Sequence, residues 1–358
     1  MGEAMNLPIK IRPFDPHAAS PELWASFHAS RRAIAADLWP DNPVLSDEET
    51  EIELKRVDPL NDVRRWIALA GGDVIGSARA FFRRHGTPNA DEHAPYLYCW
   101  GAVQPGSRLR GAGSLLLREV HGLMTSLGKT MLTTSAHTEP GHAFLTHAGA
   151  VAKLKTVASR AMFSQLDWDQ LRLWEDAASG LGLVWECFAG RVPRERLAAF
   201  CPAFTDLFTG VPLGELDVAP VRFEIEGYDQ WYQTLDRVGG AHHLVVLRAP
   251  DGAVAGISEA GWDSRTPGFV EQQLTAVARS WRARGVAKAL KARLIRQVHD
   301  SHPEAELMRT GNADSNKPML SINARVGFKV HRCFVDYQIT RAALDAWLAA
   351  TPLPGFRG

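Results

Sequence analysis

Neither sign of charge dominates this sequence, its cysteines lack metal-binding spacing, and no long hydrophobic run occurs. Forty Lys and Arg balance forty Asp and Glu in 358 residues, so no net field draws the chain to nucleic acid or an anionic membrane. The four cysteines are scattered without CxxC pairs, and we expect reduced core residues. No apolar stretch reaches the ~20 residues of a membrane span, and the first residues lack the apolar core of a secretion signal. We therefore expect a cytoplasmic protein with local anion sites.

Motifs of several enzyme classes are also missing. The sequence has no GxSxG of a hydrolase and no GxxxxGK[ST] of a nucleotide triphosphatase. His137, His142 and His147 recur every five residues, but this spacing places neighbours on different helix faces, and Pro140-Gly141 interrupts any helix there. We therefore predict no metal site.

The length suggests about two domains of the usual ~100 to 200 residues, and a repeated motif supports this division. Arg108 to Gly113 follows the apolar run 96–103 and opens an apolar-periodic helix. Arg282 to Ala287 stands in the same context 174 residues later, and the flanking segments repeat in the same order. We predict two copies of one α/β unit, residues 1–175 and 176–358.

Each repeated motif has the composition of a phosphate site. A strand, a turn of basic and small residues and a helix follow one another, so unpaired N–H groups at the helix start point toward a ligand. The helix end adds about half a positive charge, and the arginines add more. The sequence therefore predicts two pyrophosphate sites.

The order of elements favours a mixed sheet. Strands outnumber helices before each motif, and hairpins are expected around Gly71-Gly72 and Asp251-Gly252. This order fits a partly antiparallel sheet with helices on both faces better than a doubly wound parallel sheet. Residues 151–166 alternate well enough to supply the last pair of strands of the first copy.

With these residues in place, the chain resembles the GNAT superfamily of acyl-CoA-dependent N-acyltransferases. The family's signature is Arg or Gln, two residues, Gly, one residue, then Gly or Ala, and it lies between the fourth strand and the third helix. The signature occurs once in each half of this chain. In the second half it is followed by Thr310 to Phe328, an Asn-rich strand and helix ending in Gly-Phe. This arrangement resembles acetyltransferases with two GNAT domains, such as mycothiol synthase. The resemblance implies two tandem GNAT folds, each a mostly antiparallel sheet with splayed central strands flanked by helices.

The resemblance also implies where acetyl-CoA binds. The fourth strand would pair with the pantetheine amides, the loop would wrap the pyrophosphate, and Asn316 would bond the pantetheine arm. In the second copy the implied residues are Thr275, Ala276, Val277, Arg282, Ala283, Arg284, Gly285, Val286, Ala287, Asn316 and Asn323. In the first copy they are Val103, Arg108, Arg110, Gly111 and Gly113, and this copy either binds CoA without turnover or is inactive.

Glu271 is the candidate general base, because it lies six residues before Val277, where many family members carry a carboxylate. The alternative is an exposed strand residue. Counting back six residues from Val103 gives Leu97, so the asymmetry favours the second copy as the active one. The family's usual acid, a tyrosine four residues before the Gly of Gly-Phe, is replaced by Asn323, which leaves the general acid unidentified.

The preferred function is transfer of an acetyl group from acetyl-CoA to the primary amine of a small molecule. The alternatives are a non-catalytic acyl-CoA-binding or sensing protein and a protein or peptide N-acetyltransferase. Trp231, Tyr232 and Trp262 line an acceptor pocket in one interpretation and belong to the core in the other. The acceptor itself, and whether the chain is a monomer or a homodimer, stay open.

Overall fold

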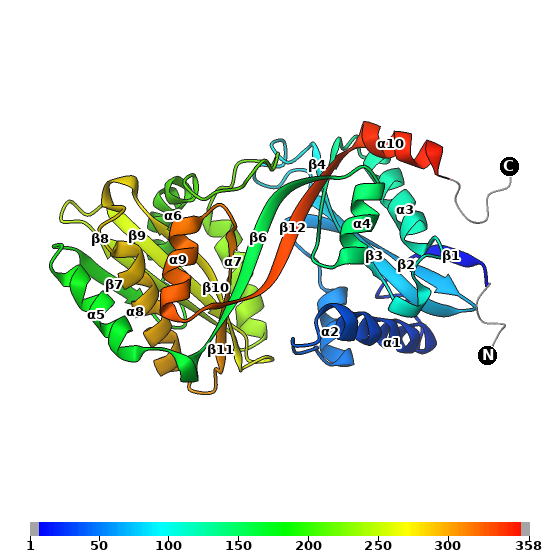
Figure 1. The fold of residues 1–358 in the computed structure, drawn as a ribbon. Coiled ribbons are helices and arrows are strands. Elements are labelled where there is room, and N and C mark those ends of the chain that lie inside the picture. The colour runs from blue at the N-terminus through cyan, green and yellow to red at the C-terminus, as the bar shows by residue number, and fades with distance from the viewer. Residues whose placement is uncertain (1–6, 352–358) are drawn as a thin grey trace. The chain divides into compact units, whose positions relative to one another are not determined.

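A computed structural model describes residues 7–351. The chain divides into two compact units (Figure 1). Unit 1 holds the residues up to Lys153, the short segment Leu216–Ala219 and the residues from Val335 onward. Unit 2 holds Leu154–Glu215 and Pro220–Phe334. None of the helices within the described residues is long and apolar enough to cross a membrane.

Unit 1 is a mixed sheet with helices on both faces. Its strand order is β1-β2-β3-β4-β5-β12, and only β4 and β5 are parallel neighbours. The elements are β1 (Ile9–Pro13), α1 (Pro21–Leu38), α2 (Asp47–Lys55), β2 (Asn61–Ala70), β3 (Asp73–Arg83), β4 (Tyr96–Val103), α3 (Ala112–Ser126), β5 (Met131–Ala136), α4 (Glu139–His147), the second half of β12 (Lys329–Thr340) and α10 (Arg341–Ala350).

Unit 2 repeats this architecture. Its strand order is β7-β8-β9-β10-β11-β6, and only β10 and β11 are parallel. The elements are β6 (Val151–Met162), α5 (Trp168–Ser179), β7 (Val184–Phe188), α6 (Arg194–Phe208), α7 (Ile225–Arg237), β8 (Ala241–Arg248), β9 (Val254–Trp262), β10 (Phe269–Val277), α8 (Val286–Ser301), β11 (Leu307–Ala313) and α9 (Lys317–Val326).

The last strand of each unit comes from the other half of the chain. β6 follows the first copy in sequence but pairs with β11 of unit 2, and β12 follows the second copy but pairs with β5 of unit 1. The prediction that residues 151–166 form the last strand pair of the first copy is therefore wrong: they contain one long strand, and it completes unit 2. An alternating pattern specifies the faces of a strand, not its partner. The boundaries of the two units therefore differ from the predicted single boundary near residue 175.

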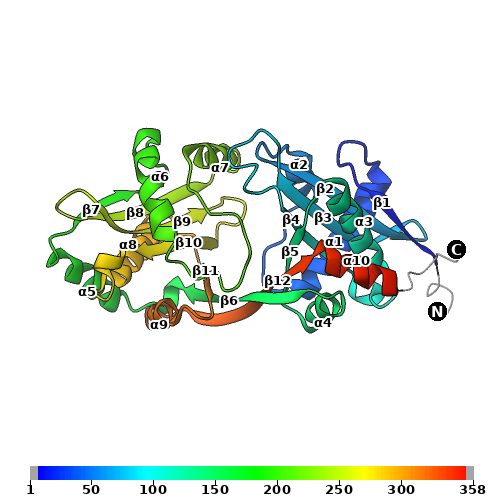
Figure 2. The ribbon, with the colours of Figure 1, turned by 90° about the horizontal axis from the view of Figure 1, so that it is seen from above.

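Each sheet is covered on both faces by apolar helix stripes. In unit 1, α3 and α10 pack on one face and α1 on the other. In unit 2, α8 packs beside α5 on one face (Figure 2), and α6 and α7 cover the other. Leu244–Leu247 of β8 are completely buried, as expected for a strand covered on both sides.

Candidate functional site

The loops between the fourth strand and the following helix have the same backbone conformation in both units. Leu109 and Ala283 have φ values of +58° and +59°, and Gly111 and Gly285 both have φ of +87°. Positive φ is unfavourable for residues other than glycine. The same pair of left-handed residues, two positions apart, therefore identifies the same loop conformation in both units. The sequence repeat is therefore also a repeat of backbone geometry.

The helices that follow these loops begin without a side-chain cap. α3 starts after Gly111 and α8 after Gly285, both in the left-handed region. Within residues 7–351 no acceptor takes up the N–H groups of Gly285, Val286 and Ala287. A Cβ placed on Gly285 would meet no atom within 4 Å, so open space adjoins these donors. Free N–H groups at a helix start suit the phosphate oxygens of CoA.

The central parallel strands separate in both units, as predicted. β10 pairs with β11 only over Phe269–Glu271, and β4 pairs with β5 only over Tyr96–Tyr98. Beyond these residues, β10 continues through Thr275, Ala276 and Val277, where β9 is its only partner strand. Its other edge is available for pairing with an extended amide ligand.

A β-bulge distinguishes the splay of unit 2 from that of unit 1. The pairing of β9 with β10 shifts by one residue between Gln272 and Thr275. The pairing of β3 with β4 runs from Gly76 with Val103 to Phe81 with Tyr98 without a shift. A bulge leaves backbone groups out of the ladder and often adjoins an active site. Only in unit 2, therefore, is the fourth strand irregular at the point where the two parallel strands separate, which we call the apex of the splay.

The first arginine of each loop has one contact in common. The Nε atom of Arg282 donates to the carbonyl of Val277 at 3.1 Å, and that of Arg108 donates to the carbonyl of Val103 at 3.2 Å. Each arginine thus ties its loop to the end of the preceding strand. This structural role was not part of the sequence prediction.

The same two arginines differ in their remaining contacts. Arg108 forms an ion pair with Asp37 near the end of α1. Arg282 lies against Gly210, where an added Cβ would clash with the guanidinium, and no carboxylate of the described residues pairs with it. The positive charge is therefore compensated in unit 1 and uncompensated in unit 2. Of the second arginines, Arg284 lies 5.0 Å from the ring centre of Trp281, and Arg110 is partly exposed.

Glu271 lies at the last paired position before the splay, opposite Arg309 of β11, with which its carboxylate forms an ion pair. Burial raises the pKa of Glu271, and Arg309 partly opposes this effect. The side chain nevertheless keeps 47% of its surface exposed. A carboxylate that holds a proton more readily, with access to solvent, is suited to accept one.

The counterpart of Glu271 in unit 1 is Tyr98, not Leu97. Glu271 is the third and last residue of β10 paired with β11, and Tyr98 is the third and last of β4 paired with β5. Counting back from the strand end gave Leu97 because β10 contains one extra residue, the bulge. Leu97 is completely buried in the core. With either alignment, unit 1 lacks a carboxylate at this position.

The two asparagines have partners within the protein. Asn316 caps α9, its Oδ1 accepting from the N–H of Met319 at 3.3 Å. Asn323 is buried and donates its amide to Oδ1 of Asn312 at 2.6 Å. Its own Oδ1 has no partner among the described residues. Contacts of either residue with a cofactor stay predictions.

A buried lysine next to β10 was missed by the sequence analysis. Lys291 of α8 contacts Oε1 of Gln272, whose amide donates to the hydroxyls of Ser258 and Thr275 at 3.1 and 3.0 Å. Burial lowers the pKa of Lys291 to about 7. The sequence feature that could have revealed it is a lysine next to the apolar residues Leu290 and Leu294 of the same helix, which are fully buried. The network fixes the residues that flank the bulge.

A second polar cluster lies on the opposite face of the unit 2 sheet. The hydroxyl of Tyr232 accepts from the N–H of Val192 at 3.0 Å and contacts Nδ1 of the buried His242 at 2.9 Å. His242 also lies 3.4 Å from the buried carboxylate of Glu259. Tyr232 belongs to the core, which confirms the core interpretation for this residue, and the cluster stabilises the packing of α7.

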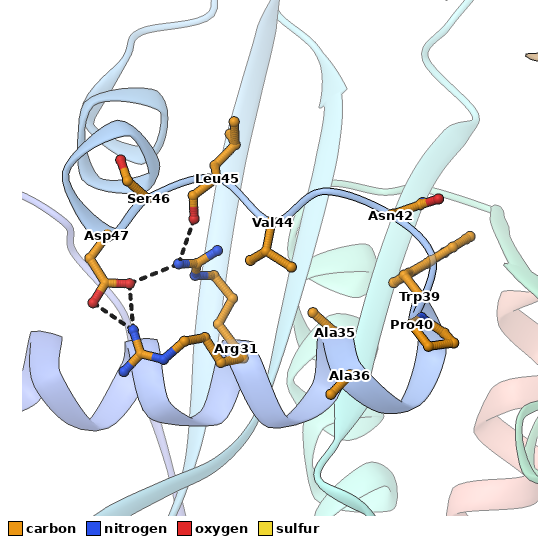
Figure 3. A pocket seen from close by; sticks show the side chains of 11 residues that line it. Arg31, Ala35, Ala36, Trp39, Pro40, Asn42, Val44, Leu45, Ser46 and Asp47 are labelled. Atoms are coloured by element: carbon orange, nitrogen blue, oxygen red, sulfur yellow. Dashed lines mark hydrogen bonds and ion pairs between the residues drawn. The ribbon is translucent and has the colours of Figure 1, made fainter. Parts of the chain in front are cut away.

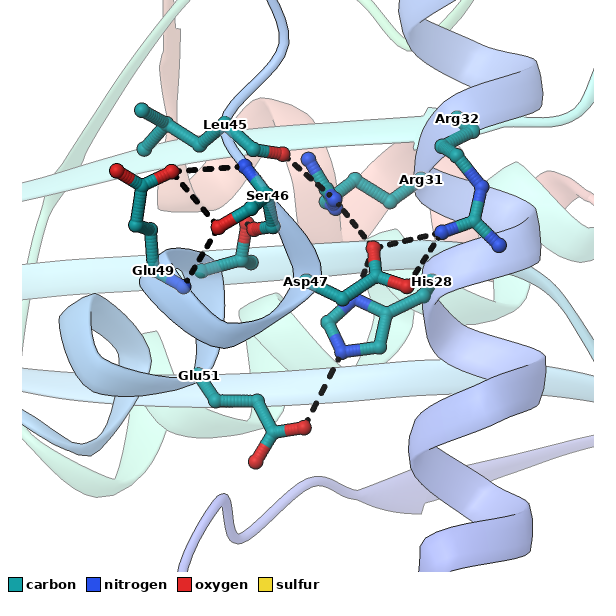
Figure 4. A network of polar contacts seen from close by, with 9 residues as sticks. His28, Arg31, Arg32, Leu45, Ser46, Asp47, Glu49 and Glu51 are labelled. Atoms are coloured by element: carbon teal, nitrogen blue, oxygen red, sulfur yellow. Dashed lines mark hydrogen bonds and ion pairs between the residues drawn. The ribbon is translucent and has the colours of Figure 1, made fainter. Parts of the chain in front are cut away.

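A cavity in unit 1 lies beside the end of α1, the helix whose Asp37 pairs with Arg108 of the repeated loop. It measures about 600 Å³ and is formed by α1 and the segment before α2 (Figure 3), with Arg31, Arg32, Ala35, Ala36, Trp39, Pro40, Asn42, Val44, Leu45, Ser46 and Asp47 as its lining. Asp47 accepts from both Arg31 and Arg32, and the buried His28 lies between Asp47 and Glu51 (Figure 4). Its arginines are thus already paired.

The family comparison matches a segment within the first half of the chain. Residues 31–150 match the Acetyltransferase (GNAT) family, a range that contains the loop of Arg108 to Gly113. On its sequence motifs alone, the second half of the chain resembled the GNAT superfamily more closely than the first half did. A search of curated proteins finds no match.

Solved structures match nearly the whole chain. A tandem GNAT protein from the clavulanic acid biosynthesis pathway, solved without AcCoA, is 21% identical with a TM-score of 0.71, covering 93% of this chain and 99% of that one. A GCN5-related N-acetyltransferase from Sphaerobacter thermophilus is 16% identical with a TM-score of 0.65, covering 94% and 97%. At these identities the likeness establishes the fold. Residues 31–150 therefore match the acetyltransferase (GNAT) family, and the chain as a whole has the fold of a tandem GNAT protein.

Proposed function

We propose that unit 2 transfers an acetyl group from acetyl-CoA to the primary amine of a small molecule in the cytoplasm. The observation that carries this proposal is the combination, in unit 2, of an uncompensated Arg282, a bulge at the apex of the splay and a carboxylate at its edge. The tandem GNAT neighbour is described by reference to AcCoA, which supports acetyl-CoA as the donor.

The residues of unit 2 fit the donor in three places. The N–H groups of Gly285, Val286 and Ala287, together with Arg282, would hold the pyrophosphate. The open edge of Thr275 to Val277 would pair with the pantetheine amides. Backbone N–H groups that the bulge leaves out of the strand pairing would polarise the thioester carbonyl, whose carbon is the electrophile in the reaction.

Glu271 would accept the proton of the acceptor amine. An ammonium has no lone pair, so the amine must lose a proton before or during attack on the carbonyl carbon. The new C–N bond forms, the C–S bond breaks, and the proton passes to the carboxylate of Glu271, directly or through water. The thiolate leaves without an assigned acid, because Asn323 carries no proton that it can release.

One observation favours a second function. Asn323 replaces the tyrosine acid and is buried in a pairing with Asn312, an arrangement compatible with a protein that binds acyl-CoA without turning it over. The two functions differ in whether CoA is released.

The deciding experiment is release of free CoA thiol from acetyl-CoA, measured with a thiol reagent across small amines, amino-acid-like amines and peptides. We expect turnover with at least one small amine and micromolar binding of acetyl-CoA. Binding without thiol release for any amine would support the sensing function, turnover with peptides alone would identify a peptide acetyltransferase, and absence of binding would overturn both.

A further inference from the structure

Two arginines on the sheet of unit 1 lie side by side without a counter-charge. Arg65 of β2 is the direct cross-strand partner of Arg79 of β3. Arg65 projects from the same face as Ile67, which packs under α1, because residues two apart in a strand share a face. No acidic side chain of the described residues contributes to the electrostatics of either guanidinium.

This arrangement is unfavourable without an anion. Like charges directly opposite one another destabilise a sheet, and burial lowers the pKa of both arginines. The Nε atom of Arg65 is buried and has no hydrogen-bond partner among the described residues, which costs the desolvation of a charged donor. An oxyanion between the two side chains would relieve each of these penalties.

Flat aromatic rings border the arginine pair. Trp100 of β4 is the cross-strand partner of Arg79, whose guanidinium lies 4.7 Å from the indole ring centre. The ring of Phe81 stacks on Trp100 at 5.2 Å and on Tyr98 at 5.1 Å. Trp100 keeps 43% of its surface exposed. The charged pair therefore opens beside an accessible aromatic surface on the same face.

We infer that this face of unit 1 binds a small oxyanion carried on a planar ring, with the anion between Arg65 and Arg79 and the ring against Trp100 and Phe81. Guanidinium groups bind carboxylates and phosphates through paired N–H donors, and aromatic faces accept planar ligands by stacking. The site is separate from the loop of unit 2, so it does not depend on the proposed acetyl transfer. An aromatic carboxylate and an aromatic phosphate share this chemistry.

The test is calorimetric titration of the full-length protein with benzoate and with phenyl phosphate. Acetate and inorganic phosphate serve as anions without a ring, and benzyl alcohol as a ring without an anion. We expect saturable binding of at least one aromatic anion, at least tenfold tighter than its ringless counterpart and than benzyl alcohol. The tighter of benzoate and phenyl phosphate identifies the preferred oxyanion.

Variants separate the site from general charge effects. Arg79→Gln and Arg65→Gln should each weaken binding of the aromatic anion by tenfold or more, and Trp100→Leu should abolish the advantage over the ringless anion. Arg64→Gln is the matched control, because Arg64 projects from the opposite face of β2 over Phe82 and should leave binding unchanged. Unfolding curves verify that each variant is folded.

Three results would overturn the inference: no saturable binding at millimolar concentration, equal binding of ringless anions, or equal effects of Arg64→Gln and Arg79→Gln. If Arg65→Gln does not fold, Arg79→Gln decides alone, because Arg79 is the more exposed of the two arginines. Acetyl-CoA binding measured on the same samples should not change, so failure of this site and failure of the proposed function are distinguishable.

Discussion

The two copies of the loop have the same backbone conformation but differ in the contacts of single side chains. Arg282 and Arg108 make the same bond to the end of the preceding strand, but only Arg108 is paired with an acid, Asp37. Glu271 stands where unit 1 has Tyr98. These differences concern charge and proton transfer, so they affect ligand binding and catalysis more than folding.

Replacement of Glu271 by Gln should slow acetyl transfer by about a hundredfold or more, in line with the ~10²- to 10⁴-fold usual for general bases. The amide keeps the shape and removes the proton acceptor, while acetyl-CoA affinity should change little. Steady-state kinetics checks this, with Glu306→Gln, an exposed carboxylate, as the control. Wild-type rate in the Glu271 variant would mean that it is only a strand residue.

Replacement of Arg309 by Gln should move the acid limb of the rate profile to higher pH. Burial raises the pKa of Glu271, and Arg309 and, to a smaller extent, Arg160 lower it, so removal of Arg309 leaves the upward effect less opposed. The base is then protonated, and the rate lost, at a higher pH. Rates measured from pH 5 to 9 test this. A limb that stays in place, or moves down, would contradict the assignment of Glu271 as the base.

At the scale of elements, the sequence predicted the loop and missed the bulge. The basic and small residues of 108–113 and 282–287, placed between a strand and a helix, predicted an open helix start, and both loops have it. The bulge between Gln272 and Thr275 depends on strand pairing, which no local pattern specifies. The polar networks were missed for the same reason, since their members are distant in sequence.

Replacement of Asp37 by Asn should strengthen acetyl-CoA binding to unit 1 by severalfold. The change leaves the guanidinium of Arg108 without its counter-charge, as Arg282 is in unit 2. Titration of the Gly285→Asp protein isolates this weaker site. The gain should vanish in the Asp37→Asn, Arg108→Gln double variant, and persistence of the gain there would contradict the role of Arg108.

At the scale of the whole molecule, the repeat was predictable and the exchange of strands was not. Matching offsets in the sequence predicted two copies and the mixed sheet of each. The alternation of residues 151–162 predicted a strand but not its pairing with β11. Long-range pairing is decided by the whole sheet, so the natural limits of unit 2 lie near residues 154 and 334.

This arrangement predicts which fragments fold. Residues 154–334 keep the whole paired part of β6, residues 156–162, whereas residues 176–358 lack β6 and most of α5 and leave the edge of β11 unpaired. We expect cooperative thermal unfolding, followed by circular dichroism, for the first fragment and aggregation for the second. A stable, cooperative 176–358 fragment would show that β6 and the start of α5 are dispensable for unit 2.

The most direct test of the central claim, that the loop of unit 2 holds acyl-CoA, is calorimetric titration of acetyl-CoA into the full-length protein with Gly285 replaced by Asn or by Asp. Asn and Asp have similar size and both tolerate the left-handed conformation that Gly285 adopts, so they differ mainly in charge. We predict that Gly285→Asp binds at least tenfold more weakly than Gly285→Asn, because its carboxylate opposes the pyrophosphate, and that the same pair at Gly111 differs much less. Equal affinities for the two Gly285 variants, or a larger difference at Gly111, would contradict the assignment.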